Sequence, residues 1–201
     1  MKRSIEIEKE ILFTFKIVIV GGPSVGKTCL FNRFCFNSFN FDTSMTIGLN
    51  FHSINLKIVN KYTQDFSSEI YIVNSIFDFG GQERFKPLIP KFIGGANGVL
   101  FVFDLTNKIS LEQLDFWYDA LLKYAEGSMI PKILVGSKSD LLEKENKEYS
   151  INKTTIEKIL KEKQLEGYYE TSALKNLNVV KVFKQLNNLM LRNQNLPYIV
   201  L

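Results

Sequence analysis

The chain predicts an α/β domain in which helices cover both faces of a mostly parallel β-sheet, and three observations lead to this fold class. Apolar runs alternate along the chain with segments whose apolar residues recur at helical spacing. One apolar run passes at once into a glycine-rich loop and then into a helical pattern, the order typical of a strand–loop–helix unit. One further segment alternates strictly between apolar and polar residues, which is typical of a strand with one solvated face.

The elements follow in order from these patterns. Strands are expected over residues 11–20, 51–59, 70–79, 98–103, 132–135 and 168–169. Helical spacing follows the glycine-rich loop and returns over residues 111–122, 156–160 and 179–190. A polar turn at residues 61–68 joins the alternating strand to the next one as a hairpin and leaves the alternating strand at the sheet edge. Strands that alternate with helices imply right-handed crossovers and a mostly parallel sheet.

The glycine-rich loop has the pattern GxxxxGK[ST], a phosphate-binding loop between a strand and a helix. Its backbone N–H groups and the positive end of the helix dipole favour an anion at this point. Lys27 can reach the outer phosphates of a nucleotide, and the Thr28 hydroxyl can ligate Mg²⁺. The bland alternative is a strand-to-helix turn without a ligand. Nucleotide contacts are expected from Gly21, Pro23, Ser24, Val25, Gly26, Lys27, Thr28 and Cys29.

A metal site and a catalytic group are expected just past two other elements. Asp78 lies at the end of the 70–79 strand, where it can hold Mg²⁺ from the side opposite Thr28. The Thr46 hydroxyl, in the loop before the alternating strand, can complete the metal shell. Gly81 lets a backbone N–H approach the terminal phosphate, and Gln82 can orient a water for in-line attack. The bland alternative for Gln82 is a polar loop residue.

A base-recognition site is expected past the last two strands. The Asp140 carboxylate can accept two hydrogen bonds from the N1–H and the N2 amine of guanine, whereas adenine offers no such pair. After the 168–169 strand come Ser172, Ala173 and Leu174, and the Ala173 N–H can meet the guanine carbonyl. Ligands bind at the carboxyl ends of strands in such sheets, so these motifs should converge at one edge.

With five motifs in this order, residues 13–193 resemble the Ras superfamily of small GTPases, and within it the Rab-like members. The resemblance implies a P-loop NTPase G domain with six strands, five parallel and one antiparallel at the edge. It leaves residues 1–12 as an N-terminal extension and residues 194–201 as a C-terminal tail. It implies GTP and GDP as ligands, Mg²⁺ as cofactor, and a molecular switch that hydrolyses GTP slowly without an activating partner.

The resemblance also assigns residues and partners. Phe39 matches the aromatic that lies against the guanine edge, and Lys138 matches the lysine whose stem covers the base. Phe51, Phe77 and Phe92 stand where Rab-like proteins carry an aromatic cluster read by effectors. Activating proteins, exchange proteins and effectors would read the switch loops and the edge strand near Phe51.

Four features depart from the Rab-like pattern. Ser137 replaces the usual asparagine of the base motif, and one lost hydrogen bond would weaken nucleotide binding by about 1–2 kcal/mol. Asp-Phe-Gly-Gly-Gln at residues 78–82 resembles the second switch motif of Arf-like and Roc-type domains. Pro23 stands where many relatives have glycine. The hairpin turn is long, and the lipidated cysteine tail is missing.

Two other functions and one open feature remain at this stage. A nucleotide-loaded interaction module with negligible turnover would also fit the departures at Ser137, Phe79 and Pro23. A P-loop kinase would need an arginine-rich lid, and only Arg3, Arg33, Arg84 and Arg192 are present. Of these, Arg84 is expected to pair with a carboxylate on the surface rather than to act as an internal arginine finger. The tail at residues 196–201 is an unpacked terminus, a strand packed on the domain, or a docking peptide.

Composition bounds partners and location. Of 201 residues, 45% are hydrophobic and 23% charged, enough for one domain with a core, and the net charge of +4 comes from scattered lysines rather than a nucleic-acid-binding patch. No apolar run approaches the roughly 20 residues that span a bilayer. No glycine at position 2 signals myristoylation, and no C-terminal cysteine signals prenylation. The expectation is a cytoplasmic protein, with any membrane association through a partner.

Overall fold

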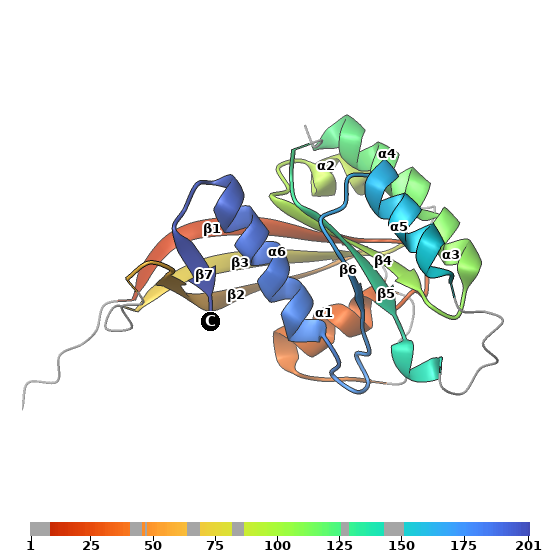
Figure 1. Ribbon diagram of the computed structural model, residues 1–201, viewed down its shortest axis with the longest axis horizontal. Helices are drawn as coiled ribbons and strands as arrows, with labels where there is room; N and C mark the ends of the chain where they lie inside the picture. The colour runs from red at the N-terminus through yellow and green to blue at the C-terminus, as the bar shows by residue number, and fades with distance from the viewer. Residues whose placement is uncertain are drawn as a thin grey trace, which may run out of the picture.

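A seven-stranded β-sheet organises the residues that the computed structural model describes, which are 9–40, 46, 48–63, 69–81, 87–125, 129–142 and 151–201 (Figure 1). The strand order is β6-β5-β4-β1-β3-β2-β7, and β2 alone runs against the others. The strands are β1 (Glu10–Val20), β2 (Leu49–Asn60), β3 (Ile70–Phe79), β4 (Gly98–Asp104), β5 (Lys132–Ser137), β6 (Tyr168–Glu170) and β7 (Tyr198–Val200).

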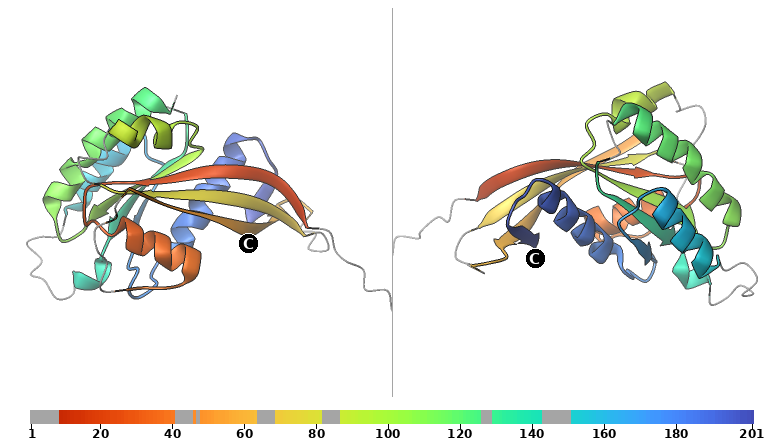
Figure 2. Two further views of the ribbon diagram at one scale, coloured as in Figure 1. Left: turned by 180° about the vertical axis from the view of Figure 1, so that it is seen from behind. Right: turned by 45° about the horizontal axis from the view of Figure 1, so that its top comes forward.

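Helices cover both faces of this sheet, as predicted (Figures 1 and 2). One face carries α2 (Ile89–Ile93), α3 (Lys108–Glu112), α4 (Leu114–Tyr124) and α5 (Lys153–Glu162). The other carries α1 (Lys27–Phe36) and α6 (Val179–Asn193), and a short 3₁₀ helix, η2 (Ser139–Leu141), follows β5. Each face has its own apolar core, one including Phe183 of α6 and the other Trp117 of α4.

The burial of the strands explains their sequence patterns. Every residue of β4 and β5 is buried, which is why these strands read as unbroken apolar runs. Exposure alternates along the first half of β2, where Phe51, Ser53 and Asn55 are exposed. The predicted one-sided strand is therefore confirmed.

The expected six-stranded sheet is wrong by one strand. Tyr198–Val200 forms β7, which pairs antiparallel with Ile58–Asn60 of β2. This pairing satisfies backbone groups on the edge of β2 and buries Val200 in the core beside α6. The last residues of β2 therefore do not lie at the sheet edge, and the C-terminal segment is a strand packed on the domain.

Two further boundaries differ from the sequence prediction. Strand β1 begins at Glu10, which pairs with Ile70, so the sheet reaches into residues 1–12, expected to be an extension. The helix expected over residues 111–122 is two helices, α3 and α4, which meet at Gln113. The ψ angle of −14° at Gln113 is closer to a 3₁₀ turn than to an α-helix, which breaks the helix there.

Candidate functional site

The loop between β1 and α1 folds tightly against the sheet and against its own lysine. A Cβ on Gly21 would lie 2.1 Å from the Val102 carbonyl oxygen, so only glycine fits at that position. The Lys27 Nζ donates hydrogen bonds to the carbonyl oxygens of Gly21 at 3.0 Å and Gly22 at 2.6 Å. The side chain thus lies back across the loop, as a phosphate-binding lysine must.

The other loop residues predicted to contact a nucleotide lie between the end of β1 and the first turn of α1. Ser24 and Gly26 have positive φ angles of 58° and 91°, which turn the chain into the start of α1. Pro23 is exposed, Val25 is buried, and Cys29 is half-buried in the first turn of the helix. Because α1 begins at Lys27, its N–H groups and dipole face the loop.

Three side chains from separate segments meet beside Lys27. The Thr28 Oγ1 lies 2.6 Å from the Thr46 Oγ1 and donates a hydrogen bond of 2.6 Å to the Asp78 Oδ2. Asn50 of β2 also donates to the Asp78 Oδ2, at 2.9 Å. The sequence prediction of Thr28, Thr46 and Asp78 as neighbours is consistent with this arrangement.

Asn50 was missed from the sequence, although a signal was present. It pairs with Asp78 in the register between β2 and β3. It also falls on the apolar phase of an alternating strand, where a polar residue is out of pattern.

This group of oxygens fits a Mg²⁺ ion. The Asp78 Oδ1 is buried and has no hydrogen-bond partner among the described residues, so one carboxylate oxygen is available. Mg²⁺ prefers oxygen ligands and is held by few carboxylates together with phosphate and water. Among the described residues, no group of three or more His, Cys, Asp and Glu side chains could hold a metal ion.

Burial perturbs the two charged groups of this site. It lowers the pKa of Lys27 from 10.5 to about 8, and the Asp78 carboxylate opposes part of that shift. Burial raises the pKa of Asp78, whereas hydrogen bonds from Thr28 and Asn50 and the charge of Lys27 act in the other direction. A bound polyphosphate would stabilise the ammonium, and a bound cation would stabilise the carboxylate.

The loop after β3 lies directly on the phosphate-binding loop. A Cβ on Gly81 would lie 2.6–2.7 Å from backbone atoms of Gly22 and Pro23, so any larger residue would push the loops apart. The Gly80 N–H donates to the Gly48 carbonyl at 3.0 Å, which links this loop to the one that carries Thr46. Gln82 and Arg84 lie outside the described residues.

Residues that the sequence analysis expected at the base come together at the ends of β5 and β6. The Ser172 hydroxyl donates to the Asp140 Oδ1 at 2.5 Å, and the Ser139 N–H donates to the Thr171 carbonyl at 3.0 Å. Ser172 is fully buried and Asp140 is half-buried. The hydrogen bond from Ser172 thus fixes the orientation of the Asp140 carboxylate. Phe39 is half-buried and Leu174 is 39% exposed.

Ser137 links the base site to the phosphate-binding loop. Its hydroxyl lies 2.5 Å from the Val25 carbonyl and 2.9 Å from the Phe103 carbonyl. A hydroxyl has one proton, so it can donate to only one of these oxygens at a time. Serine thus keeps part of the tethering that an asparagine amide would supply.

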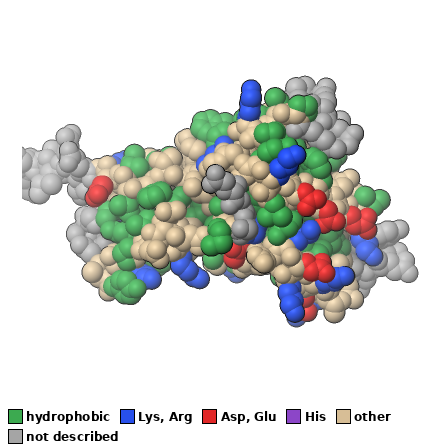
Figure 3. All heavy atoms as spheres, turned by 90° about the horizontal axis from the view of Figure 1, so that it is seen from above, with side chains coloured by type: hydrophobic (Ala, Val, Ile, Leu, Met, Phe, Trp, Pro, Cys, Tyr) green, Lys and Arg blue, Asp and Glu red, His purple; other side chains and the backbone are tan. Residues whose placement is uncertain are grey.

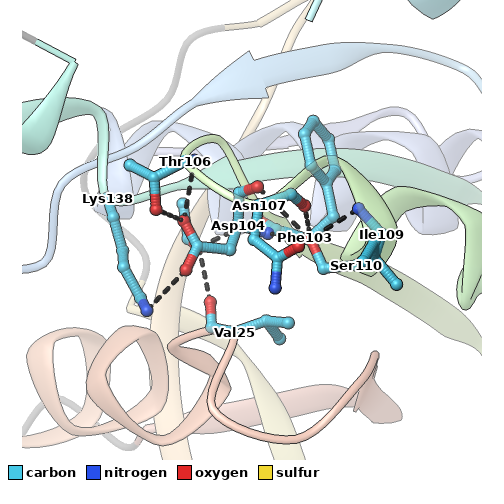
Figure 4. Close-up of polar contacts among 9 residues, drawn as sticks. Val25, Phe103, Asp104, Thr106, Asn107, Ile109, Ser110 and Lys138 are labelled. Carbon is cyan, nitrogen blue, oxygen red and sulfur yellow. Dashed lines mark hydrogen bonds and ion pairs between the residues drawn. The ribbon is translucent and has the colours of Figure 1, made fainter. Parts of the chain in front are cut away.

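Lys138 is held by an acidic residue that the sequence analysis missed. Its Nζ lies 2.6 Å from the Asp104 Oδ2, and the Asp104 Oδ1 accepts hydrogen bonds from the Thr106 N–H and hydroxyl (Figure 4). Ser110 donates to the Asn107 carbonyl at 2.6 Å and steadies the turn after β4. The signal was a lone carboxylate at the end of an otherwise apolar strand.

A surface beside the site carries the exposed Phe51 and the half-buried Phe77. Phe51 is 54% exposed, and its ring centroid lies 4.9 Å from that of Phe77. Phe92, expected in the same cluster, is half-buried, and its ring centroid lies 5.5 Å from that of Phe79.

Charges of both signs are interspersed on the surface towards the end of the molecule that carries α4 and α5 (Figure 3).

No helix within the described ranges is both long and apolar enough to cross a bilayer.

Comparison with known proteins gives a consistent answer. The sequence model of the Ras family matches residues 16–192. The chain is 36% identical over 180 residues to the Ras-related protein Rab-11C of Dictyostelium discoideum, a match that covers 89% of this chain and 73% of that protein. It is 34% identical over 178 residues to the Ras-related protein RABA6a of Arabidopsis thaliana, covering 88% and 69% of the two chains. It is 32% identical over 174 residues to the Ras-related protein YPTC6 of Chlamydomonas reinhardtii, covering 87% and 74%. The chain therefore belongs to the Ras family of small GTPases, which bind guanine nucleotides and hydrolyse GTP, and it is Rab-like.

Proposed function

We propose that the protein is a GTP/GDP-dependent molecular switch that binds GTP with Mg²⁺ and hydrolyses it slowly to GDP and phosphate. The observation that carries this proposal is the meeting of Thr28, Thr46 and Asp78, whose oxygen atoms approach to 2.6 Å from three separate segments. Two of these segments flank the phosphate-binding loop and can respond to what occupies it. A static strand-to-helix turn would not need this convergence.

The residues of the phosphate side have separate tasks in this proposal. Lys27 and the backbone N–H groups of residues 21–28 other than Pro23 hold the phosphates and stabilise charge on the transferring group. Thr28, Thr46 and Asp78 would hold Mg²⁺, which neutralises phosphate charge when bound. The Gly81 N–H would approach the terminal phosphate, and Gln82 would orient the attacking water.

Switching follows from the links between these loops. Thr46 and Gly81 would both be drawn in by a terminal phosphate, and the Gly80–Gly48 hydrogen bond makes the two loops move together. Loss of that phosphate removes both attractions at once. Because Arg84 is expected to pair with a surface carboxylate rather than serve as an arginine finger, the domain would turn over at about 10⁻⁴ to 10⁻² s⁻¹ until an activating protein binds.

Guanine is selected by Asp140, with Ser172 fixing its carboxylate and Lys138 covering one face of the base. Substituting Asp140→Asn should shift preference from guanine to xanthine nucleotides, because the amide offers a donor where the carboxylate offered an acceptor. Unchanged GTP affinity and selectivity in that variant would remove Asp140 from base recognition.

Effectors, activating proteins and exchange proteins would read the two loops, the exposed Phe51 and the half-buried Phe77 beside it. An exposed large hydrophobic residue on an otherwise polar strand phase marks a candidate contact surface. We place the protein in the cytoplasm, with any membrane association through a partner.

Single-turnover hydrolysis of bound GTP, with and without Mg²⁺, tests the function. Wild type should release phosphate only with Mg²⁺, and Gln82→Leu should slow release more than tenfold while GTP still binds normally. An equal rate in wild type and Gln82→Leu would refute the role of Gln82. Bound GTP that is never cleaved would point instead to a nucleotide-loaded interaction module.

A further inference from the structure

Arg33, near the end of α1, joins two segments that lie 140 residues apart in the sequence. Its Nε donates to the Ala173 carbonyl at 2.7 Å, and its Nη2 lies 3.5 Å from the Leu174 carbonyl. Its Nη1 donates to the carbonyl and to the side-chain oxygen of Asn37, at 2.9 and 3.2 Å. One planar guanidinium therefore holds the end of α1 and the loop after β6 at the same time.

Both of these segments lead to the expected position of the base. The Ala173 N–H would meet the guanine carbonyl, and the bonded Ala173 carbonyl belongs to the next peptide along. Asn37 is the left-handed cap of α1 and precedes by two residues Phe39, the aromatic expected at the guanine edge. The guanidinium thus connects the segment that leads to Phe39 with the segment that carries the Ala173 N–H.

We propose that Arg33 is a positioning residue for guanine. It holds the segment that leads to Phe39 and the segment that carries Ala173 at the separation that the base requires, and so sets how long a nucleotide stays bound. This inference rests on the proposed function. Arg33 contacts neither the phosphate-binding loop nor the Thr28–Thr46–Asp78 group in any hydrogen bond among the described residues. Its effect should therefore fall on the base and not on the chemistry at the phosphates.

A simpler reading makes Arg33 a cap of the helix end. A basic residue in the last turn of a helix is favourable through the helix dipole and through bonds to the last carbonyls. Bonds to Asn37 alone would satisfy that role. The 2.7 Å bond to Ala173 crosses to another element and is not needed for capping.

The size of the effect is limited because the loop after β6 has bonds of its own. Ser172 and Leu177 exchange two backbone hydrogen bonds, at 3.2 and 2.9 Å, and the Lys175 N–H donates to the Ser172 hydroxyl. Without Arg33 the loop should therefore stay folded and shift away from the base. We expect release of GDP to become about tenfold faster, the scale of losing one charge-assisted hydrogen bond.

The test uses the full chain loaded with the fluorescent GDP analogue mantGDP and chased with excess GDP in Mg²⁺. Release should be about tenfold faster in Arg33→Met than in wild type. It should be intermediate in Arg33→Lys, because an ammonium lacks the planar set of N–H donors with which arginine bonds several carbonyl oxygens at once. Arg192→Met, at an exposed arginine in the last turn of α6, is the matched control and should leave release unchanged.

Three further measurements separate positioning from structural support. Single-turnover hydrolysis and the Mg²⁺ concentration for half-maximal hydrolysis should each stay close to wild type in Arg33→Met. The melting temperature of the loaded protein should fall by no more than the few degrees that a tenfold weaker nucleotide affinity costs. Unchanged release in both Arg33 variants overturns the proposal, as does a parallel loss of hydrolysis and Mg²⁺ dependence. Failure of wild type to take up mantGDP would instead overturn the proposed function beneath it. Should Arg33→Met not fold, Arg33→Lys carries the same test.

Discussion

The Ser137 hydroxyl joins the base loop to the phosphate-binding loop with one proton shared between two carbonyl oxygens. The distances are 2.5 Å to Val25 and 2.9 Å to Phe103, and the side chain is buried. An asparagine amide carries two N–H donors, so Ser137→Asn could bond both oxygens together. The Ser137 side chain lies against Gly26, where a Cβ would come within 3.5 Å of the Ser137 hydroxyl oxygen.

One added hydrogen bond contributes about 1 kcal/mol, so Ser137→Asn should slow GDP release about fivefold. Removing the hydroxyl in Ser137→Ala leaves a buried carbonyl with one fewer donor and should speed release about tenfold, for a cost of about 1–2 kcal/mol. The assay is release of mantGDP under a GDP chase in Mg²⁺, with the melting temperature of each loaded variant as the folding control.

Release from Ser137→Asn at the wild-type rate or faster, in a variant that melts like wild type, would refute this reasoning. Such a result would mean that the second carbonyl needs no donor, and that serine costs this protein no affinity. Equal rates for wild type and Ser137→Ala would go further and show that the tether does not hold the nucleotide at all.

Three other predictions follow from burial and from the metal site. Chelation of Mg²⁺ should speed GDP release at least tenfold in wild type and have little effect in Asp78→Asn, measured by mantGDP release; an equal response of both would contradict the metal assignment. Asn74 is fully buried on β3, and neither amide atom has a hydrogen-bond partner among the described residues, so Asn74→Val should raise the free energy of unfolding by about 1–2 kcal/mol, seen as a later urea midpoint; an earlier midpoint would show that the amide is satisfied. Val200→Asp should lower that free energy by about 2 kcal/mol through loss of β7 from the core, whereas Ile199→Asp, at a 41% exposed position of the same strand, should change it little; equal urea midpoints in the two variants would show that β7 adds no stability.

The phosphate and metal side of the site could be predicted because its residues form short motifs next to clear strands. Lys27 and Thr28 belong to an eight-residue motif at positions 21–28. Asp78 lies on a strand with a clear apolar run. Local spacing fixes such residues before any tertiary contact is known.

The supporting residues could not be predicted, because their roles exist only in the folded chain. Asn50 meets Asp78 across 28 residues, and Arg33 meets Ala173 across 140. Asp104, at the end of β4, forms an ion pair with Lys138, which directly follows β5. Asn50 and Asp104 are each visible as a polar residue out of pattern in an apolar strand phase, but the sequence pattern does not say which partner either residue meets.

The seventh strand was only one of three alternatives for the tail, and the sequence could not choose among them for a related reason. Three residues are too short to show a strand pattern, and Tyr198–Val200 becomes a strand only because the edge of β2 is there to pair with it.

The residues at the carboxyl ends of the strands should together bind a guanine nucleotide. The most direct test is mass spectrometry of the nucleotide that copurifies with the protein in Mg²⁺-containing buffer. GDP or GTP, at about one molecule per chain, is the result expected from Asp140 and the phosphate-binding loop. ATP in its place, or a folded protein that carries no nucleotide and takes up none, would contradict the account.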